Sequence, residues 1–471
     1  MKSISLLVLL LFCLDVTYAQ HQDLHEKPKI WLADNSNAGD STTLLSAFKS
    51  GSINGHFRFF HSSIRNQGDL SDYHANAIGG GLRYESGSFH GLRVGVSGFY
   101  IFNAVSSDLA LKDNVTGQAN RYEIGLFDIA NPSDLNEINR IEELFLKYKR
   151  NETMFTFGRQ LLNTPFINLQ DGRMRPTSVE GIWFETAFNK IHHFQSGWIY
   201  GIAPRGTKKW YSLASSIGVY PSGVNELGIK SDYYGNIKTS GAFFFNYENK
   251  VIKNLTINFW DMWVQNIMNT ALLQAEWQKQ LTTIKFYSGV QLTLQNKSGD
   301  GGNSDDRKTY YSSNDPLLIY GARMGIKTDK WDHSLNFNHI GDSGRYLMPR
   351  EWGRDNFYTF MSRERNEGFG GVTAVVGKTT YTLFQKTSFQ LSYGYFLLPD
   401  VKNFELNKFG MPAYTQMNID IRHKFSGLLN GFESQLLWVF KWKKGETYDD
   451  PRYVIHKVDM NLLNIVINFR F

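Results

Sequence analysis

The sequence MNLLNIVINFRF, residues 460–471, decides the fold class. From position 463 onward every odd position is apolar, whereas the even positions include Asn464, Asn468 and Arg470. Such alternation gives a strand one apolar and one polar face. An exposed edge strand of this kind invites aggregation in water, and closing the sheet into a membrane barrel removes the edge. The stretch therefore favours a barrel strand over the edge of a soluble sheet.

The same alternation recurs along the chain, for example over residues 92–102 and 143–149. At roughly 25 residues per strand and loop, residues 20–471 suffice for about 18 strands, an even number within the range of bacterial barrels. The predicted fold is all-β, a transmembrane antiparallel up-and-down β-barrel of about 18 strands over residues 51–471. A barrel of this size encloses a water-filled channel.

The N-terminus predicts export to the cell outer membrane. Lys2 precedes a short apolar run that ends near a small residue, Ala19, which is the pattern of a cleaved secretory signal peptide over residues 1–19. The only cysteine, Cys13, lies inside it, so no disulfide is expected afterwards. Residues 20–50 do not alternate and are predicted to form a periplasmic or lumenal extension, too short for a large plug.

Composition limits the function classes. Aromatic residues make up 15% of the chain and glycines number 42, which suits barrel strands and aromatic girdles. The net charge of +6 is spread without basic runs, so no nucleic-acid partner is expected. No Gly-x-Ser-x-Gly nucleophile motif occurs, which disfavours a barrel hydrolase, and the protein is predicted not to be an enzyme. The acidic loop 300–306 fits a solvated surface better than a calcium site, so no metal or cofactor is predicted.

A first arginine-rich stretch interrupts the alternation at residues 158–177. It carries Arg159, Arg173 and Arg175, together with Asp171. Folded into the pore, these arginines would form a positive constriction in which Asp171 holds one guanidinium group. Folded outward, the same stretch would be a solvated loop.

A second stretch, residues 341–368, interleaves arginines with acidic and aromatic residues. Its arginines include Arg350, Arg354, Arg363 and Arg365. Arginine recognises the planes of carboxylate and phosphate groups with a fork of donors that lysine lacks. The alternative is a loop scaffold that neutralises its own charge and only supports the barrel wall.

These two stretches resemble the OprD-like outer-membrane porin family. The similar strings are GRQ (158–160), DGRMRP (171–176), RYLMPREWGR (345–354) and RERNEG (363–368), and they point to a subgroup distinct from the amino-acid channels. The resemblance implies a monomeric 18-stranded barrel whose inward loops carry a row of substrate-guiding arginines. The terminal Phe471 resembles the sorting signal read by the barrel assembly machinery.

The sequence therefore predicts a passive, moderately selective porin for small anionic or zwitterionic solutes, namely carboxylates or amino acids. Its other contact is the lipid of the Gram-negative outer membrane. The predicted constriction comprises Arg159, Asp171, Arg173, Arg175, Arg350, Arg354, Arg363 and Arg365. A gated uptake barrel and an adhesive or structural barrel remain as alternatives.

Overall fold

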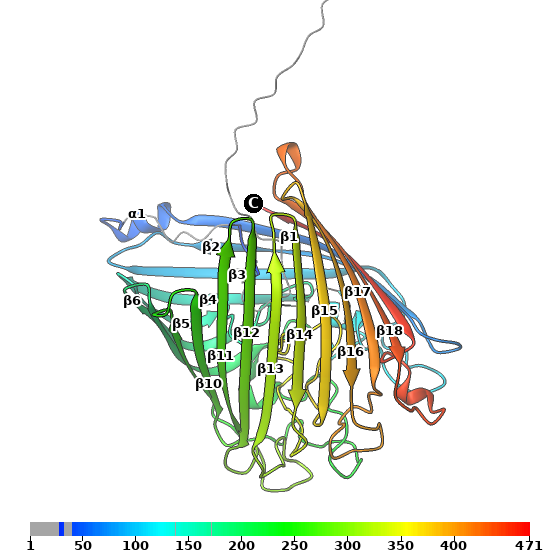
Figure 1. Ribbon diagram of the computed structural model, residues 1–471. Helices are drawn as coiled ribbons and strands as arrows, with labels where there is room; N and C mark the ends of the chain where they lie inside the picture. The colour runs from blue at the N-terminus through cyan, green and yellow to red at the C-terminus, as the bar shows by residue number, and fades with distance from the viewer. Residues whose placement is uncertain (1–27, 33–39, 137, 171) are drawn as a thin grey trace, which may run out of the picture.

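The computed structural model describes residues 28–32, 40–136, 138–170 and 172–471, which form a closed antiparallel barrel (Figure 1). Eighteen strands make the wall, and the two-residue β8 extends the edge of β7. The prediction of an 18-stranded barrel is confirmed. The strands are β1 Ser52–Arg65, β2 Tyr73–Glu85, β3 Leu92–Ser106, β4 Ile138–Arg150, β5 Thr153–Gln160, β6 Ser178–Phe188, β7 His192–Ala203, β8 Tyr211–Ser212, β9 Ala242–Asn249, β10 Leu255–Val264, β11 Met268–Leu281, β12 Ile284–Lys297, β13 Leu317–Lys327, β14 Trp331–Ile340, β15 Val372–Leu383, β16 Thr387–Leu397, β17 Tyr414–Lys424, β18 Phe432–Lys443 and β19 Met460–Arg470.

The last strand closes the barrel against the first. β19 pairs with β1 from His56 opposite Arg470 to Arg65 opposite Asn461. Beyond the strand, Gly55 and Phe471 exchange two backbone hydrogen bonds of 2.8 and 3.1 Å. A Cβ atom on Gly55 would lie 2.1 Å from the Phe471 ring, so only glycine leaves room for that ring against β1.

The alternation of residues 460–471 sorts side chains between the two faces of the wall. Met460, Leu462, Asn464, Asn468 and Arg470 are among the side chains buried inside the barrel, and the odd-numbered apolar residues between them face outward. Exposed apolar side chains cover the outer face of most other strands in the same way. The predicted apolar exterior is therefore present in the folded chain, whereas the inner face mixes polar side chains with apolar ones such as Met460 and Leu462.

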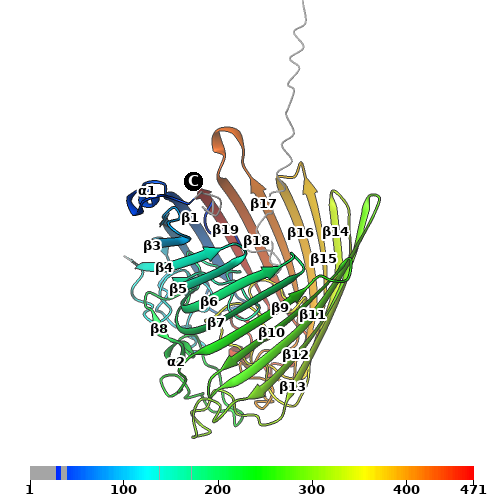
Figure 2. The ribbon, with the colours of Figure 1, turned by 90° about the vertical axis from the view of Figure 1, so that its left-hand side faces the viewer.

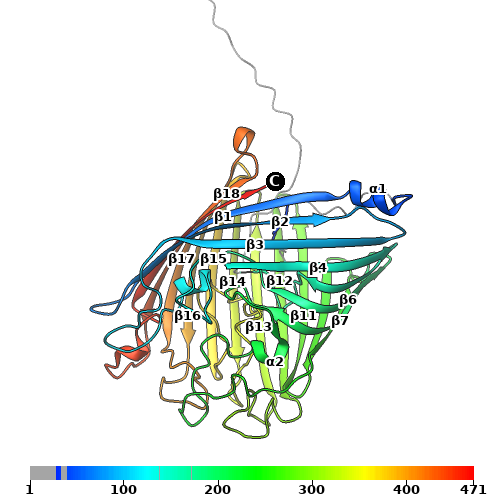
Figure 3. The ribbon, with the colours of Figure 1, turned by 180° about the vertical axis from the view of Figure 1, so that it is seen from behind.

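Short turns and long loops gather at opposite ends (Figures 2 and 3). The turn end also holds α1 (Leu44–Lys49) and the C-terminus, and η2 (Gly427–Leu429) lies in the β17–β18 turn. The loop end carries η1 (Glu123–Leu126), α2 (Leu213–Ser216) and η3 (Pro451–Tyr453). In the described part of the chain, no helix is long and apolar enough to cross a membrane.

The loops fill the barrel toward the loop end. Phe166 and Ile167 of the β5–β6 loop and Trp352 of the β14–β15 loop are 0% exposed and belong to one apolar cluster with inward side chains of the wall. Both connections are therefore folded into the lumen, the interior of the barrel. For residues 158–177 this is the inward one of the two alternatives that the sequence left open.

A short N-terminal segment also lies in the lumen. Ile30 and Trp31 are buried, and they pack with Phe99 of β3 and Leu169 of the β5–β6 loop. The Trp31 indole donates to Glu143 at 2.9 Å and lies 5.3 Å from the Phe99 ring centre. Part of the predicted extension over residues 20–50 is thus lumenal; the predicted signal peptide, residues 1–19, lies outside the described residues.

Candidate functional site

The two inward loops are tied to each other by one asparagine. Asn168 donates from Nδ2 to the Arg354 carbonyl at 2.9 Å and accepts from the Arg354 amide at 3.1 Å. The neighbouring Gly353 has no room for a side chain, because a Cβ atom there would lie 2.7 Å from the Asn168 amide. The two arginine-rich stretches therefore form one body inside the barrel.

Amide side chains of the wall hold the β14–β15 loop in place. Gln295 of β12 donates to the Leu347 carbonyl at 2.9 Å and accepts from the Leu347 amide at 3.0 Å. Gln416 of β17, five strands further along the wall, donates to the Ser362 carbonyl at 2.8 Å. Buried backbone groups need such partners, so these glutamines replace water as the loop's hydrogen-bonding environment.

Two acidic residues of the β14–β15 loop form ion pairs with arginine and lysine side chains around them. Glu364 accepts from Arg121 at 2.9 Å and from Lys441 at 2.8 Å. Glu367 lies 2.6 Å from Arg350 Nε and 3.5 Å from Lys408 Nζ. Because each carboxylate serves two cations, the acids pre-organise the basic groups.

Burial and neighbouring charges act in opposite directions on these acids. Burial raises the pKa of Glu364, but Arg121 and Lys441 outweigh it and lower the pKa to about 2. Burial raises the pKa of Glu351 to about 7. The backbone amide of Tyr220, which donates to this carboxylate at 2.7 Å, acts in the other direction and lowers the pKa, but by less. Glu364 is therefore a permanent anion among cations, whereas Glu351 titrates near neutrality.

A cavity of about 700 Å³, here called the vestibule, lies among the long loops. One carboxylate, Glu364, and nine basic side chains line it. The basic residues are Arg121, Arg173, Arg205, Arg350, Arg363, Arg365, Lys408, Arg452 and Lys457. Such an excess of cations in a partly enclosed space creates a strongly positive potential.

A second cavity of about 70 Å³, here called the inner cavity, lies between the inward loops and the wall strands β1, β17, β18 and β19. Its basic lining includes Arg58 of β1 and Arg422 of β17, together with loop arginines. Pro28 and Ile30 of the N-terminal segment also line it. The segment therefore contributes to the narrowness of the lumen on this side.

Arg363 is the basic residue that both cavities share. Its Nε donates to Asn464 of β19 at 2.7 Å, and its carbonyl accepts from Tyr122 at 3.0 Å and from Lys441 at 3.2 Å. Its φ of 75° lies in the left-handed region that residues other than glycine rarely adopt. Strained backbone persists where the surroundings fix it, and here they fix a residue that lines both cavities.

The structure brings six of the eight predicted site residues to these cavities. Arg173, Arg350 and Arg365 line the vestibule, Arg175 and Arg354 line the inner cavity, and Arg363 lines both. Asp171 lies outside the described residues.

The assignment of Arg159 to the constriction is wrong. β5 continues to Gln160, so Arg159 is still a strand residue, and it pairs with the outward-facing Leu144. Its guanidinium group lies 4.5 Å from the Trp210 ring centre and 3.4 Å from Glu180. Because side chains alternate along a strand, this register sends Arg159 to the outer face of the barrel.

Several basic residues of the two cavities were missed from the sequence. Arg58 could have been found, because it shares its strand face with Asn54 and His56, and that face is the inward one. Arg121 and Lys408 come from long loops whose positions in the lumen no local pattern reveals.

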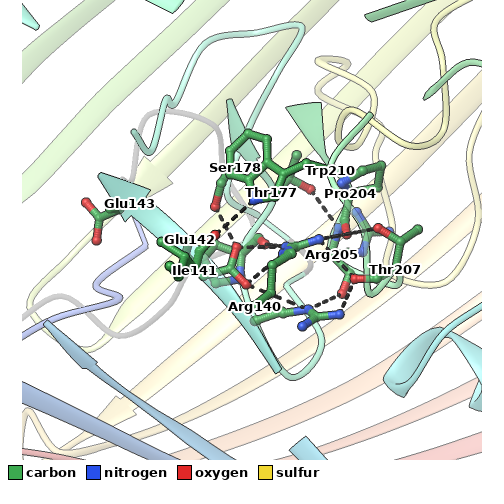
Figure 4. Close-up of polar contacts among 12 residues, drawn as sticks. Arg140, Ile141, Glu142, Glu143, Thr177, Ser178, Pro204, Arg205, Thr207 and Trp210 are labelled. Atoms are coloured by element: carbon green, nitrogen blue, oxygen red, sulfur yellow. Dashed lines mark hydrogen bonds and ion pairs between the residues drawn. The ribbon is translucent and has the colours of Figure 1, made fainter. Parts of the chain in front are cut away.

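A buried ion cluster fastens the first inward loop to the wall (Figure 4). A β-bulge in β4 lets two successive residues, Glu142 and Glu143, face the lumen. Glu142 is 0% exposed and accepts from Arg140 at 2.7 and 2.9 Å and from Ser178 at 2.8 Å. Arg175 Nε lies 3.8 Å from Glu142 Oε1. The cluster thus joins β4, β6 and the loop that carries Arg175.

Replacing Glu142 with glutamine is expected to destabilise the barrel by about 3–5 kcal/mol, because two buried guanidinium groups lose their counter-charge. The measurement is the temperature at which the folded band is lost in gel-mobility assays of heated samples. Asp305→Asn is the matched control, since Asp305 pairs with the exposed Arg307. Equal transition temperatures for the two variants would contradict a stabilising role for the cluster.

The barrel is shared with outer-membrane channels of known structure. OccAB2 of Acinetobacter baumannii aligns with a TM-score of 0.68 at 14% identity, covering 90% of this chain and 99% of that chain. OccD3 (OpdP) of Pseudomonas aeruginosa aligns with a TM-score of 0.68 at 12% identity, covering 97% of this chain and 98% of that chain. OpdK of the same organism, solved with vanillate, aligns with a TM-score of 0.68 at 11% identity, covering 90% of this chain and 99% of that chain. The fold is that of the OprD-like porins.

The OprD-like fold was expected from the arginine-containing strings, and at the level of fold the expectation is confirmed. The sequence matches no protein-family model and no curated protein. With identities of 11–14%, the likeness concerns the architecture, and the solutes of individual channels are not transferred with it.

Proposed function

We propose that the chain is an outer-membrane porin, a passive and moderately selective diffusion channel for small anionic or zwitterionic solutes. The observation that carries the proposal is the set of basic side chains around the narrowed lumen, with Arg363 shared by its two cavities. The channel is proposed to work without a catalytic step or a cofactor.

The physics is that of a charged constriction. A solute anion gains Coulomb attraction and charge-assisted hydrogen bonds from guanidinium groups, which offsets the loss of its hydration. Passage also requires release, so the attraction has to remain moderate. Glu364 and Glu367 support this balance, because they neutralise part of the charge on Arg121 and Arg350.

The solute class follows from the same groups. The fork of an arginine side chain matches a carboxylate, which both organic acids and amino acids carry. The structure of OpdK with vanillate, itself a carboxylate, supports the comparison for a channel of the same fold. Small carboxylates and amino acids are therefore the proposed solutes.

The cellular setting remains part of the proposal. Export would remove the leader after Ala19, and the barrel assembly machinery would recognise the strand that ends at Phe471. Apolar residues such as Leu463 and Ile467 face outward, where a bilayer would cover them. The barrel closes within one chain, which suits a monomer.

The experiment is a liposome swelling assay with three solutes of similar size that share a six-carbon polyol chain. Gluconate carries a negative charge, sorbitol none and N-methylglucamine a positive charge. The proposal predicts the fastest entry for gluconate and the slowest for N-methylglucamine, because the constriction attracts anions and repels cations. Equal rates for the three solutes would contradict the charge selectivity.

One observation favours a second candidate, a gated uptake barrel. Residues 28–32 occupy the lumen, and Pro28 and Ile30 line the inner cavity. A segment in that position narrows the lumen, and its movement would open the channel. The adhesive alternative has no comparable observation in the described part of the chain.

A further inference from the structure

The vestibule collects its charges from many separate connections. Arg121 comes from the β3–β4 loop, Arg205 from the β7–β9 loop, Lys408 from the β16–β17 loop and Lys457 from the β18–β19 loop. Six loops in all contribute basic side chains. The cations therefore reach the chamber from six separate loops.

Ion pairs divide several of these cations between two carboxylates. Arg121 is held at Glu364, whereas Arg350 and Lys408 are held at Glu367. On another loop, Lys457 donates to the Arg452 carbonyl at 2.6 Å. A single carboxylate, with two oxygens about one fork wide, engages one such group at a time.

The volume also exceeds the needs of a very small anion. Cavities of about 300–1,000 Å³ are typical of sites for drug-sized organic molecules, and the vestibule holds about 700 Å³. Its wall includes the rings of Tyr122, Tyr220, Phe404, Phe409 and Tyr453. These rings offer flat apolar surface for the organic body of a solute between the charged groups.

Two buried lysines support a ligand with more than one charge. Burial and Arg121 lower the pKa of Lys457 to about 7. Burial, together with Arg345 and Arg350 and against the attraction of Glu367, lowers the pKa of Lys408 to about 8. Burial disfavours both ammonium groups, so an anion beside each would raise the pKa again and be favoured by the charge it meets.

We propose that the vestibule binds organic anions with two or more separated negative groups, each group held by a different set of basic side chains. The inference rests on the proposed function and specifies its solute class. The organic body packs between the rings while the anionic groups reach Glu364-linked and Glu367-linked cations on different loops. A monocarboxylate fills one set and leaves the others without an anion from the solute.

The test is a series of ligands on one ring, titrated by calorimetry into the detergent-solubilised full chain at pH 7 and low salt. The series is benzoate, isophthalate and benzene-1,3,5-tricarboxylate, with one, two and three carboxylates. Affinity is expected to rise by about tenfold with each added carboxylate, the value of one further charge-assisted hydrogen bond. Equal affinities for the three ligands would overturn the proposal.

Phenyl phosphate separates total charge from the spacing of charges. It carries nearly two negative charges at pH 7, but at a single position. Isophthalate should bind more tightly, because its two groups reach different cations. Tighter binding of phenyl phosphate would show that one compact anion site is enough and would overturn the inference.

Variants place the binding in the vestibule. Lys408→Gln and Lys457→Gln should each weaken tricarboxylate binding severalfold and leave benzoate binding less affected. Arg307→Gln is the matched control, because the Arg307 side chain is 77% exposed on a loop outside the vestibule lining. Tricarboxylate affinities that both vestibule variants leave unchanged would overturn the site.

The outcome is distinguishable from failure of the proposed function. A protein that conducts anions but shows a flat ligand series would keep the channel and refute polyanion binding. A protein that binds the series in the expected order but does not conduct would keep the site and refute the open channel.

Discussion

Replacing Arg363 with asparagine is expected to lower the anion preference of the channel severalfold. Arg363 lines both cavities, so its charge is close to a solute in either of them. Asparagine tolerates the φ of 75° at this position better than most residues, so the backbone should persist. The measurement is the reversal potential of the variant in a planar bilayer under a salt gradient.

Arg159→Gln is the matched control for this variant. It removes one positive charge of the same kind from the outer face, where Arg159 lies against Trp210. The control should keep the selectivity of the unmodified protein. If Arg363→Asn also keeps it, the constriction does not depend on Arg363, and the assignment fails.

Replacing Trp31 with alanine is expected to raise single-channel conductance severalfold. The indole fastens residues 28–32 to Glu143 and Phe99, and its removal weakens that anchor by about 3 kcal/mol or more. The segment should then leave the lumen for much of the time and widen the inner cavity, which Pro28 and Ile30 line. Conductance of single channels in a planar bilayer measures the effect.

Trp438→Ala is the control for the loss of a tryptophan. Trp438 of β18 is 40% exposed on the outer face, away from the lumen. This control should leave conductance unchanged. An unchanged conductance of Trp31→Ala would mean that the N-terminal segment does not limit the current.

The barrel could be predicted because strand alternation is a local signal. From Leu463 to Phe471 every odd position is apolar, and the structure gives this stretch the expected inward and outward faces. Alternation fails at β-bulges, where one extra residue changes the face. At Glu142 and Glu143 such a bulge turns both side chains inward, and no local sequence pattern predicts the bulge.

The site could be predicted only in part. Arg173 and Arg350 lie in stretches that break the strand pattern, so the sequence marked them as loop residues with room to enter the lumen. Arg159 was assigned wrongly because the strand pattern in the sequence breaks at residue 158, whereas β5 continues to Gln160. Residues such as Arg121 and Lys457 meet only through packing of distant loops, which is a tertiary property.

The most direct test of the central claim is the reversal potential of the unmodified protein in a planar bilayer, with potassium chloride at unequal concentrations on the two sides. An arginine-lined lumen predicts a potential whose sign reports faster passage of chloride than of potassium. The preference should shrink as salt rises, because screening shortens the reach of the lining charges. A reversal potential of zero would contradict an anion-selective channel. So would a reversal potential whose sign shows that potassium passes faster than chloride.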